Sequence, residues 1–197
     1  MNKRRTATIE RKTRETAIKL TIDLDGDGSS KINTGIPFMD HMFELFARHG
    51  FFNLNIEASG DIEVDYHHTM EDLGLVFGDA IAKAAGDKVG IQRYGSCLLP
   101  MDEALARIVI DLSGRPYLVY QVDPPAAMIK DLDTALFREF FQAVSVKAGM
   151  NLHIAMLTGA EVHHVFEAIF KGFAKALRQS VSIDPAIKGV LSTKGML

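Results

Sequence analysis

Apolar and polar residues alternate along the segment 16–24. Ile18, Leu20, Ile22 and Leu24 share one face, and Lys, Thr and Asp residues stand between them. A period of two places successive side chains on opposite faces of an extended chain. The segment is therefore predicted to be a β-strand with one buried face.

Turn signals and helical spacing follow this strand. Residues 25–30 are rich in Asp, Gly and Ser, and we expect 31–34 to return as the hairpin partner of the strand. The segment 37–49 carries apolar residues at helical spacing, with Pro in its first turn and Gly50 after its end. The remaining predicted elements of this half are a strand and a second helix, at 52–58 and 67–85.

The chain contains an internal repeat. His67–Leu73 returns 96 positions later as His163–Ile169, and Asn53–Ile56 aligns with Asn151–Ile154 at an offset of 98. The second half repeats the predicted elements in order, with strands at 104–112, 117–122 and 151–157 and helices at 134–147 and 163–180. Two halves with the same elements in the same register indicate duplication of one α+β unit.

The repeat predicts the domain organisation. Residues 1–90 form the first half and residues 91–197 the second, fused into one compact body. Each half is expected to be a roughly four-stranded, mostly antiparallel sheet with two helices on one face.

Composition and charge exclude several classes of protein. A net charge of -3 and a pI of about 6.2 provide no broad basic surface for nucleic acid. No apolar run of about 18 residues predicts a membrane span, and the basic start lacks the apolar stretch of a secretory signal. A single cysteine, Cys97, cannot form an intrachain disulfide. These features favour the cytoplasm, with a plastid location left open.

The repeated motif has the composition of a metal site. Residues four apart lie on one face of a helix, so His67 and Glu71 face the same point, as do His163 and Glu167. Imidazole and carboxylate groups bind divalent transition metals, and two copies offer ligands for two ions. The structural alternative, histidines that only cap a helix start, is disfavoured because the motif recurs in register.

Two further residues fit the same chemistry. His41 lies on the first predicted helix, and its counterpart in the repeat is Glu139, another side chain that can bind a metal. Their spacing leaves Mn, Fe, Co, Ni and Zn open, because imidazole suits most of these ions.

Four segments together resemble imidazoleglycerol-phosphate dehydratase. They are Gly35–Met42 (GIPFMDHM), His67–Asp72 (HHTMED), His163–Lys171 (HHVFEAIFK) and Ser192–Gly195 (STKG). The resemblance spans nearly the whole chain. It implies a hydro-lyase of histidine biosynthesis that converts D-erythro-imidazole glycerol phosphate to imidazole acetol phosphate. It also implies a fold like that of ribosomal protein S5 domain 2 in each half.

The resemblance implies a manganese enzyme with two Mn²⁺ per active site. It further implies a homo-oligomer of 24 subunits, with the metals bound between neighbouring chains. The implied metal ligands are His41, His67, His68, Glu71, Glu139, His163, His164 and Glu167. Glu139 and Tyr66 depart from the pattern, because several relatives carry His at the first position and an acidic residue is common at the second.

A mechanism follows from the resemblance as a hypothesis. The carbon-bound proton beside the imidazole is weakly acidic, and a metal that binds the ring as an imidazolate lowers the barrier to its removal. Glu15 matches the position that handles this proton. The implied catalytic residues are Glu15, His41, His67, Glu71, Glu167 and Lys171. The implied substrate-binding residues, mainly donors to the phosphate, are Glu15, Arg93, Arg115, Lys171, Ser192, Thr193 and Lys194.

Two other functions fit the ligand set. A dinuclear metal-dependent hydrolase of a small phosphorylated substrate would use the same histidines and carboxylates. It would release phosphate from imidazole glycerol phosphate, whereas the dehydratase would form an enolisable ketone. A metal-storage protein would take up metal without any need for Arg93, Arg115 and Lys171.

Overall fold

The computed structural model of the chain describes residues 4–195. Its first half contains β1 (Thr6–Lys12), β2 (Thr16–Asp23), β3 (Ser30–Asn33), α1 (Pro37–Gly50), β4 (Asn53–Gly60) and α2 (His67–Ala85). The second half contains β5 (Tyr94–Met101), β6 (Ala104–Asp111), β7 (Tyr117–Gln121), α3 (Leu136–Ala148), β10 (Asn151–Thr158) and α4 (Val162–Val181). A small hairpin of β8 (Met128–Ile129) and β9 (Leu132–Asp133) precedes α3.

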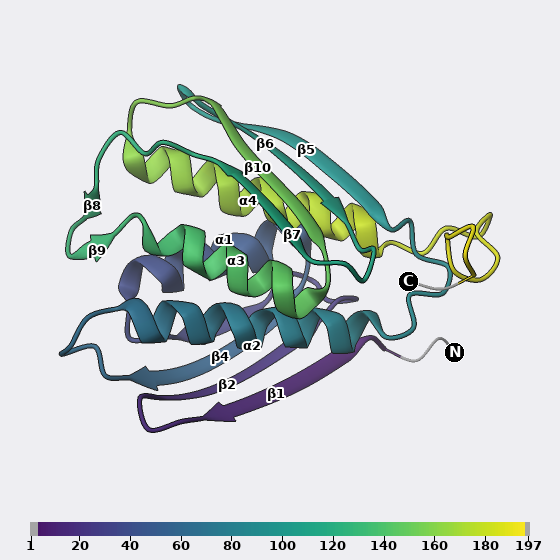
Figure 1. Ribbon diagram of the computed structural model, residues 1–197, viewed down its shortest axis with the longest axis horizontal. Coiled ribbons are helices and arrows are strands. Elements are labelled where there is room, and N and C mark those ends of the chain that lie inside the picture. The colour runs from purple at the N-terminus through teal and green to yellow at the C-terminus, as the bar shows by residue number, and fades with distance from the viewer. Residues whose placement is uncertain (1–3, 196–197) are drawn as a thin grey trace.

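The duplicated α+β architecture is confirmed. The sheets have the strand orders β1-β2-β4-β3 and β5-β6-β10-β7, so each strand of the first sheet has its counterpart in the second. The helices lie between the two sheets (Figure 1), where α1 packs against α4 and α2 against α3. Helices α1 and α2 therefore cover the inner face of the first sheet, and α3 and α4 cover that of the second.

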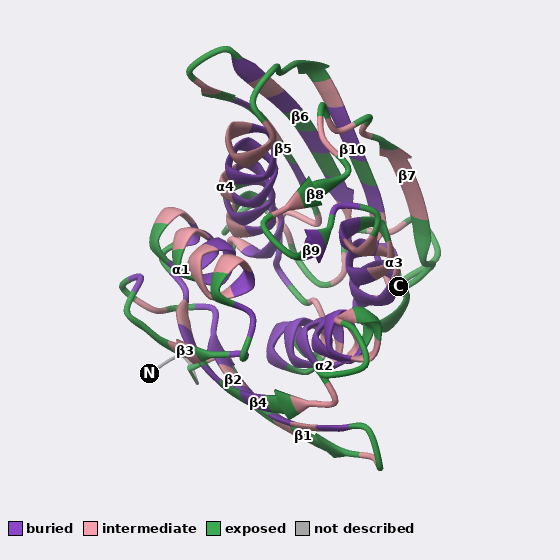
Figure 2. Ribbon diagram, turned by 90° about the vertical axis from the view of Figure 1, so that its left-hand side faces the viewer, coloured by how far each residue is buried: buried purple, intermediate pink, exposed green. Residues whose placement is uncertain are grey.

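Phenylalanines fill the space where the four helices meet. Phe43 of α1 contacts Phe77 of α2 and Phe140 of α3 edge-on, with ring centroids 5.3 and 5.7 Å apart. Helix α2 approaches α3 closely because Gly74 has no side chain, and a Cβ there would lie 2.5 Å from the carbonyl oxygen of Phe140. Figure 2 shows that the buried residues of the helices face this shared core.

One predicted pairing is wrong. Residues 31–34 were expected to pair with 16–24 as a hairpin, but β3 pairs in parallel with β4, which lies between β2 and β3. The amide groups of Asp27, Gly28 and Ser29 donate to Oδ1 of Asn53, the first residue of β4. These bonds hold the loop across the end of β4, so the chain passes over that strand instead of turning back.

The apolar pattern of the sequence does not predict one strand of each sheet, β1 in the first and β5 in the second. In β1 only Ala7 is buried, and β5 is interrupted by Gly95 and Pro100, so neither strand has a clear apolar alternation. Both are edge strands, so each pairs with a neighbouring strand on one side only. The structure therefore supplies the fourth strand that the predicted fold class required.

All four helices begin at the same end of the molecule (Figure 1). The residues after α4 lie at the opposite end, beside the start of β5. Helix α4 has 20 residues, so about 30 Å separates its two ends. None of the helices in the described part of the chain has the length and hydropathy that crossing a membrane requires.

Candidate functional site

Three of the predicted ligands converge at the helix N-termini. Nε2 of His41 lies 2.9 Å from Oε1 of Glu167, and Nε2 of His163 lies 3.1 Å from the same oxygen. Their three ligand atoms all lie within 4.8 Å of one another. His41 comes from α1 and the other two from α4, so the packing of these helices builds the group. The ring of Phe38 supports His163 edge-on, with centroids 5.2 Å apart.

Lys171 completes this group. Its Nζ donates to Oε2 of Glu167 at 2.5 Å, one helical turn along α4. Burial works to raise the pKa of Glu167, but hydrogen bonds from Lys171, His41 and His163 outweigh it and lower the pKa to about 2. Glu167 is therefore ionised at neutral pH. Two imidazole nitrogens and one carboxylate oxygen form a donor set that suits a divalent transition metal.

The first half presents a more open set of donors. Nε2 of His67 lies 3.9 Å from Oε2 of Glu71, and Nε2 of His68 lies 3.9 Å from Oε1 of Glu15. These residues come from the start of α2 and from the β1–β2 turn. Within residues 4–195 they do not form a converged group of three ligand atoms, in contrast to the group around Glu167.

The second histidine of each pair is held by a carboxylate. Nδ1 of His68 lies 3.0 Å from Oδ2 of Asp61, and Nδ1 of His164 lies 2.8 Å from Oε2 of Glu103. Hydrogen bonds to these carboxylates raise the pKa of both histidines. Such a bond fixes the ring and leaves Nε2 directed at a ligand position. Sequence reasoning did not find Asp61 or Glu103, because they lie on other elements at no motif spacing.

The two departures from the family pattern have local partners. Oε1 of Glu139 accepts a hydrogen bond from Arg138 at 3.4 Å, and the carboxylate stands outside the converged group. The hydroxyl of Tyr66 donates to Asp131 at 2.8 Å. Tyr66 thus ties the start of α2 to the β8–β9 hairpin.

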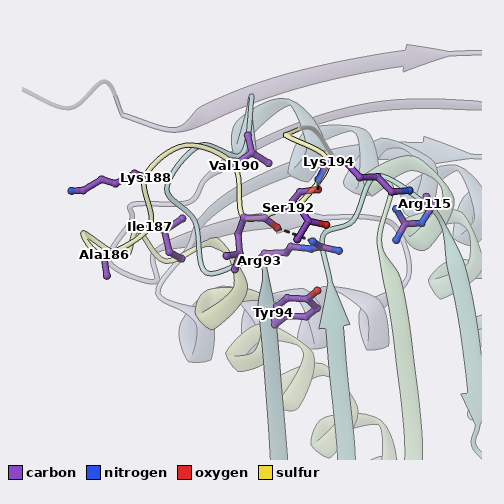
Figure 3. Close-up of a pocket in the computed structure, with 11 residues that line it drawn as sticks. Arg93, Tyr94, Arg115, Ala186, Ile187, Lys188, Val190, Ser192 and Lys194 are labelled. Carbon is purple, nitrogen blue, oxygen red and sulfur yellow. Dashed lines mark hydrogen bonds between the residues drawn. The ribbon is translucent and has the colours of Figure 1, made fainter.

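Five predicted phosphate-binding residues line one pocket at the opposite end of the molecule from the converged group. Figure 3 shows this pocket between the start of β5 and the segment after α4. Its volume is about 760 Å³. Its lining includes Arg93, Arg115, Ser192, Thr193 and Lys194. Lys171 lies apart from them, with the converged group.

Arg93 organises the pocket. Its guanidinium donates to both carboxylate oxygens of Asp111, at 2.6 and 3.1 Å, and to the carbonyl oxygen of Leu191 at 2.8 Å. The bonds to Asp111 raise the pKa of Arg93, and the bond to Leu191 holds the C-terminal segment against the sheet. The guanidinium of Arg115 makes no ion pair with any residue that the structure describes. Arg115 is therefore available to an anion.

One chain does not bring the two sets of residues together. His163 lies at the start of α4, whereas the amide of Arg93 donates to the carbonyl oxygen of Ser180 near its end. The converged group and the pocket are thus separated by most of the length of α4, about 20–25 Å from Glu167 and His163 to Ser180.

Comparisons with known proteins identify the family of the chain. Residues 34–177 match the family model described as imidazoleglycerol-phosphate dehydratase. The chain is 55% identical over 193 residues to the imidazoleglycerol-phosphate dehydratase of Geobacter metallireducens, covering 98% of this chain and 99% of that protein. It is 57% identical over 191 residues to the protein of that name from Lachnoclostridium phytofermentans, covering 97% of each.

Solved structures of the same family share the fold. The imidazoleglycerol-phosphate dehydratase of Staphylococcus aureus superposes with a TM-score of 0.83 at 39% identity, covering 91% of this chain and 99% of that one. The Pyrococcus furiosus structure, in complex with (S)-C348, gives a TM-score of 0.83 at 32% identity, covering 96% and 100%. The chain belongs to the imidazoleglycerol-phosphate dehydratase family.

Proposed function

We propose that this chain is a hydro-lyase that converts D-erythro-imidazole glycerol phosphate to imidazole acetol phosphate in histidine biosynthesis. The observation that carries the proposal is the convergence of His41, His163 and Glu167 at the helix N-termini. Membership in the family supplies the substrate, because its members carry the name of this reaction. We place the enzyme in the cytoplasm.

The donor set fits the metal that the family implies. His41, His163 and Glu167, together with His164 and Glu139, would hold one Mn²⁺, and His67, His68 and Glu71 belong to the second site. The bonds to Asp61 and Glu103 support this assignment, because they engage Nδ1 of His68 and His164 and leave Nε2 of each ring without a hydrogen bond in the described part of the chain. When bound, Mn²⁺ supplies Lewis acidity to the imidazole of the substrate.

Glu15 is the group that we assign to the proton. Its carboxylate lies 3.9 Å from His68 and makes no hydrogen bond within residues 4–195. The amide group of Asp61 donates to the carbonyl oxygen of Glu15, and Thr13 Oγ1 accepts from the amide group of Glu15. Glu15 thus has a fixed backbone and a free carboxylate, as proton transfer requires. It takes the proton from the second carbon of the side chain, and the hydroxyl on the carbon beside the ring leaves with that proton as water. The resulting enol keeps its hydroxyl on the second carbon and becomes the ketone of imidazole acetol phosphate.

The phosphate binds in the pocket at the other end of the chain. Arg115, Lys194, Ser192 and Thr193 donate to its oxygens, and Arg93 keeps the C-terminal segment in place. Lys171 remains beside Glu167 and faces the substrate from the metal side.

The active site then forms between chains. About 20–25 Å separates the pocket from the converged group, far more than a substrate with a three-carbon chain spans. A neighbouring chain therefore brings its pocket to the histidines. We propose the closed assembly of 24 subunits with two Mn²⁺ per site, built from chains whose halves, 1–90 and 91–197, are duplicates.

A direct assay tests the function. Purified protein with Mn²⁺ and imidazole glycerol phosphate should form an enolisable ketone without release of inorganic phosphate. Release of phosphate instead would support the dinuclear hydrolase. Light scattering with and without Mn²⁺ would measure the assembly, and a monomer with full activity would contradict a site shared between chains.

A further inference from the structure

The duplication pairs Glu15 with Glu103. Leu20 of β2 lies opposite Ile56 of β4, and Ile108 of β6 lies opposite Ile154 of β10. Ile56 and Ile154 are equivalent in the repeat, so Leu20 and Ile108 are equivalent as well. Counting back along β2 and β6 from this pair places Glu15 and Glu103 at the same position. Each residue directly precedes the second strand of its sheet.

The two glutamates differ in how they meet the histidine of their own half. Oε1 of Glu15 stays 3.9 Å from Nε2 of His68, whereas Oε2 of Glu103 lies 2.8 Å from Nδ1 of His164. The place on Nδ1 of His68 is taken by Asp61, at 3.0 Å. In the first half, therefore, a second carboxylate holds the histidine and Glu15 remains free.

The second half has no carboxylate at the position equivalent to Asp61. The nearest oxygens of Asp102 and Glu161 lie 3.8 and 3.9 Å from Nε2 of His164. At the offset of 98 that aligns β4 with β10, the residue equivalent to Asp61 is Gly159. A Cβ at Gly159 would lie 2.7 Å from Cγ2 of Val165, so the packing excludes a side chain there without movement. Glu103 reaches His164 from the β5–β6 turn and binds Nδ1 of that ring, as Asp61 binds Nδ1 of His68 in the first half.

Glu103 is also bound on its other oxygen. Oε1 accepts hydrogen bonds from the amide groups of Ala160 and Glu161, at 3.1 and 2.8 Å. The hydroxyl of Thr158 donates to the carbonyl oxygen of Glu103 at 3.0 Å. One residue therefore holds the β10–α4 loop and the ring of His164 together. A carboxylate with both oxygens engaged is poorly placed to exchange a proton with a substrate.

We infer that duplication divided the roles of these two glutamates. Glu15 kept a free carboxylate for proton transfer, and Glu103 became the positioning residue that holds Nδ1 of His164 so that Nε2 faces the ion. Asp61 holds Nδ1 of His68 in the same way. The inference rests on the proposed function, because it treats His164 as a metal ligand. A carboxylate in this position orients the ring and raises its basicity toward a metal.

Manganese binding separates the two roles. Mn²⁺ affinity of chelator-stripped protein would be measured by titration calorimetry, and turnover at limiting and saturating Mn²⁺. Glu103→Ala should weaken one class of site by about 10- to 100-fold and regain most turnover at saturating Mn²⁺. Glu15→Gln should bind Mn²⁺ like the wild type and lose turnover at every Mn²⁺ concentration. Glu57→Ala, which removes an exposed carboxylate from β4, should match the wild type in both measurements.

Two results would overturn the inference. One is a folded Glu103→Ala protein that binds Mn²⁺ at every site as tightly as the wild type. The other is a loss of turnover in this variant that saturating Mn²⁺ does not relieve. If Glu103→Ala does not fold, Glu103→Gln decides: a several-fold loss of affinity at one class of site supports the inference, and unchanged affinity overturns it. A wild-type protein without Mn²⁺ binding would instead refute the proposed function itself.

Discussion

Nε2 of His41 and Oε1 of Glu167 lie 2.9 Å apart, although the two residues come from different halves of the duplicated chain. The contact exists because α1 of the first half packs against α4 of the second. The candidate metal centre is thus a product of the packing between the halves, and neither half contains it alone.

Replacing Glu167 with Gln should remove most Mn²⁺ binding at its site and nearly all turnover. The substitution removes the only anionic donor of the converged group and leaves the ammonium of Lys171, which is 13% exposed, without its partner. Metal analysis of the purified variant and its thermal unfolding would measure both effects. A loss of about 1–3 kcal/mol in stability is expected from the unpaired cation. Full metal content with normal turnover would contradict this role for Glu167.

Replacing Glu15 with Gln should lower kcat by about 10²- to 10⁴-fold, the range expected for removal of a general acid–base group. The amide is nearly isosteric, and the side chain makes no hydrogen bond in the described part of the chain, so stability should change little. Steady-state kinetics and a melting curve would check this. Turnover equal to that of the wild type would exclude Glu15 from the mechanism.

Replacing Arg115 with Ala should raise the KM for the phosphorylated substrate by about 10- to 100-fold, since one charge-assisted hydrogen bond contributes about 1.5–3 kcal/mol. Metal binding should be unchanged, because Arg115 is not one of the proposed metal ligands. Arg48→Ala, which removes an exposed arginine outside the pocket, serves as the control. A KM unaffected by Arg115→Ala would remove this residue from the phosphate site.

Removal of metal by a chelator should abolish turnover, and addition of Mn²⁺ should restore it. The expectation follows from the donor set of two imidazoles and a carboxylate, which has no other evident use at this end of the molecule. Activity would be followed during titration of stripped protein with Mn²⁺. A stripped sample that converts the substrate at the full rate would refute the metal-dependent mechanism.

Replacing Asp25 with Asn should lower the melting temperature at pH 7 and have little effect at low pH. Hydrogen bonds from Arg5 outweigh burial and lower the pKa of Asp25 from 3.8. A lowered folded-state pKa contributes stability above the unfolded-state value and loses it as pH falls through the folded-state value. The difference in melting temperature between wild type and variant should therefore shrink below pH 3.8. A constant difference from pH 7 to pH 2 would contradict this account.

The local pattern of apolar and polar residues predicts most of the strands and helices of the fold. The alternation in β2 and the helical spacing in α1 and α2 reflect which side chains each element must bury, and neighbouring residues decide this. The strand β3 was recognised but paired wrongly, because pairing depends on β4, which lies later in the chain. The pattern of apolar residues does not predict the edge strand β1, because only one of its side chains, Ala7, is buried.

The amino-acid sequence by itself determined the duplication, the repeated His-His-x-x-Glu motif and the chemistry of its donors, because periodicity and spacing are local properties. Only the tertiary structure decided that His41 joins His163 and Glu167, that Glu103 holds His164, and that the proposed phosphate pocket lies at the far end of α4. These relationships depend on strand order and on the packing of helices from different halves. Contacts between segments far apart in a chain arise from the whole fold, and no short stretch of residues encodes them.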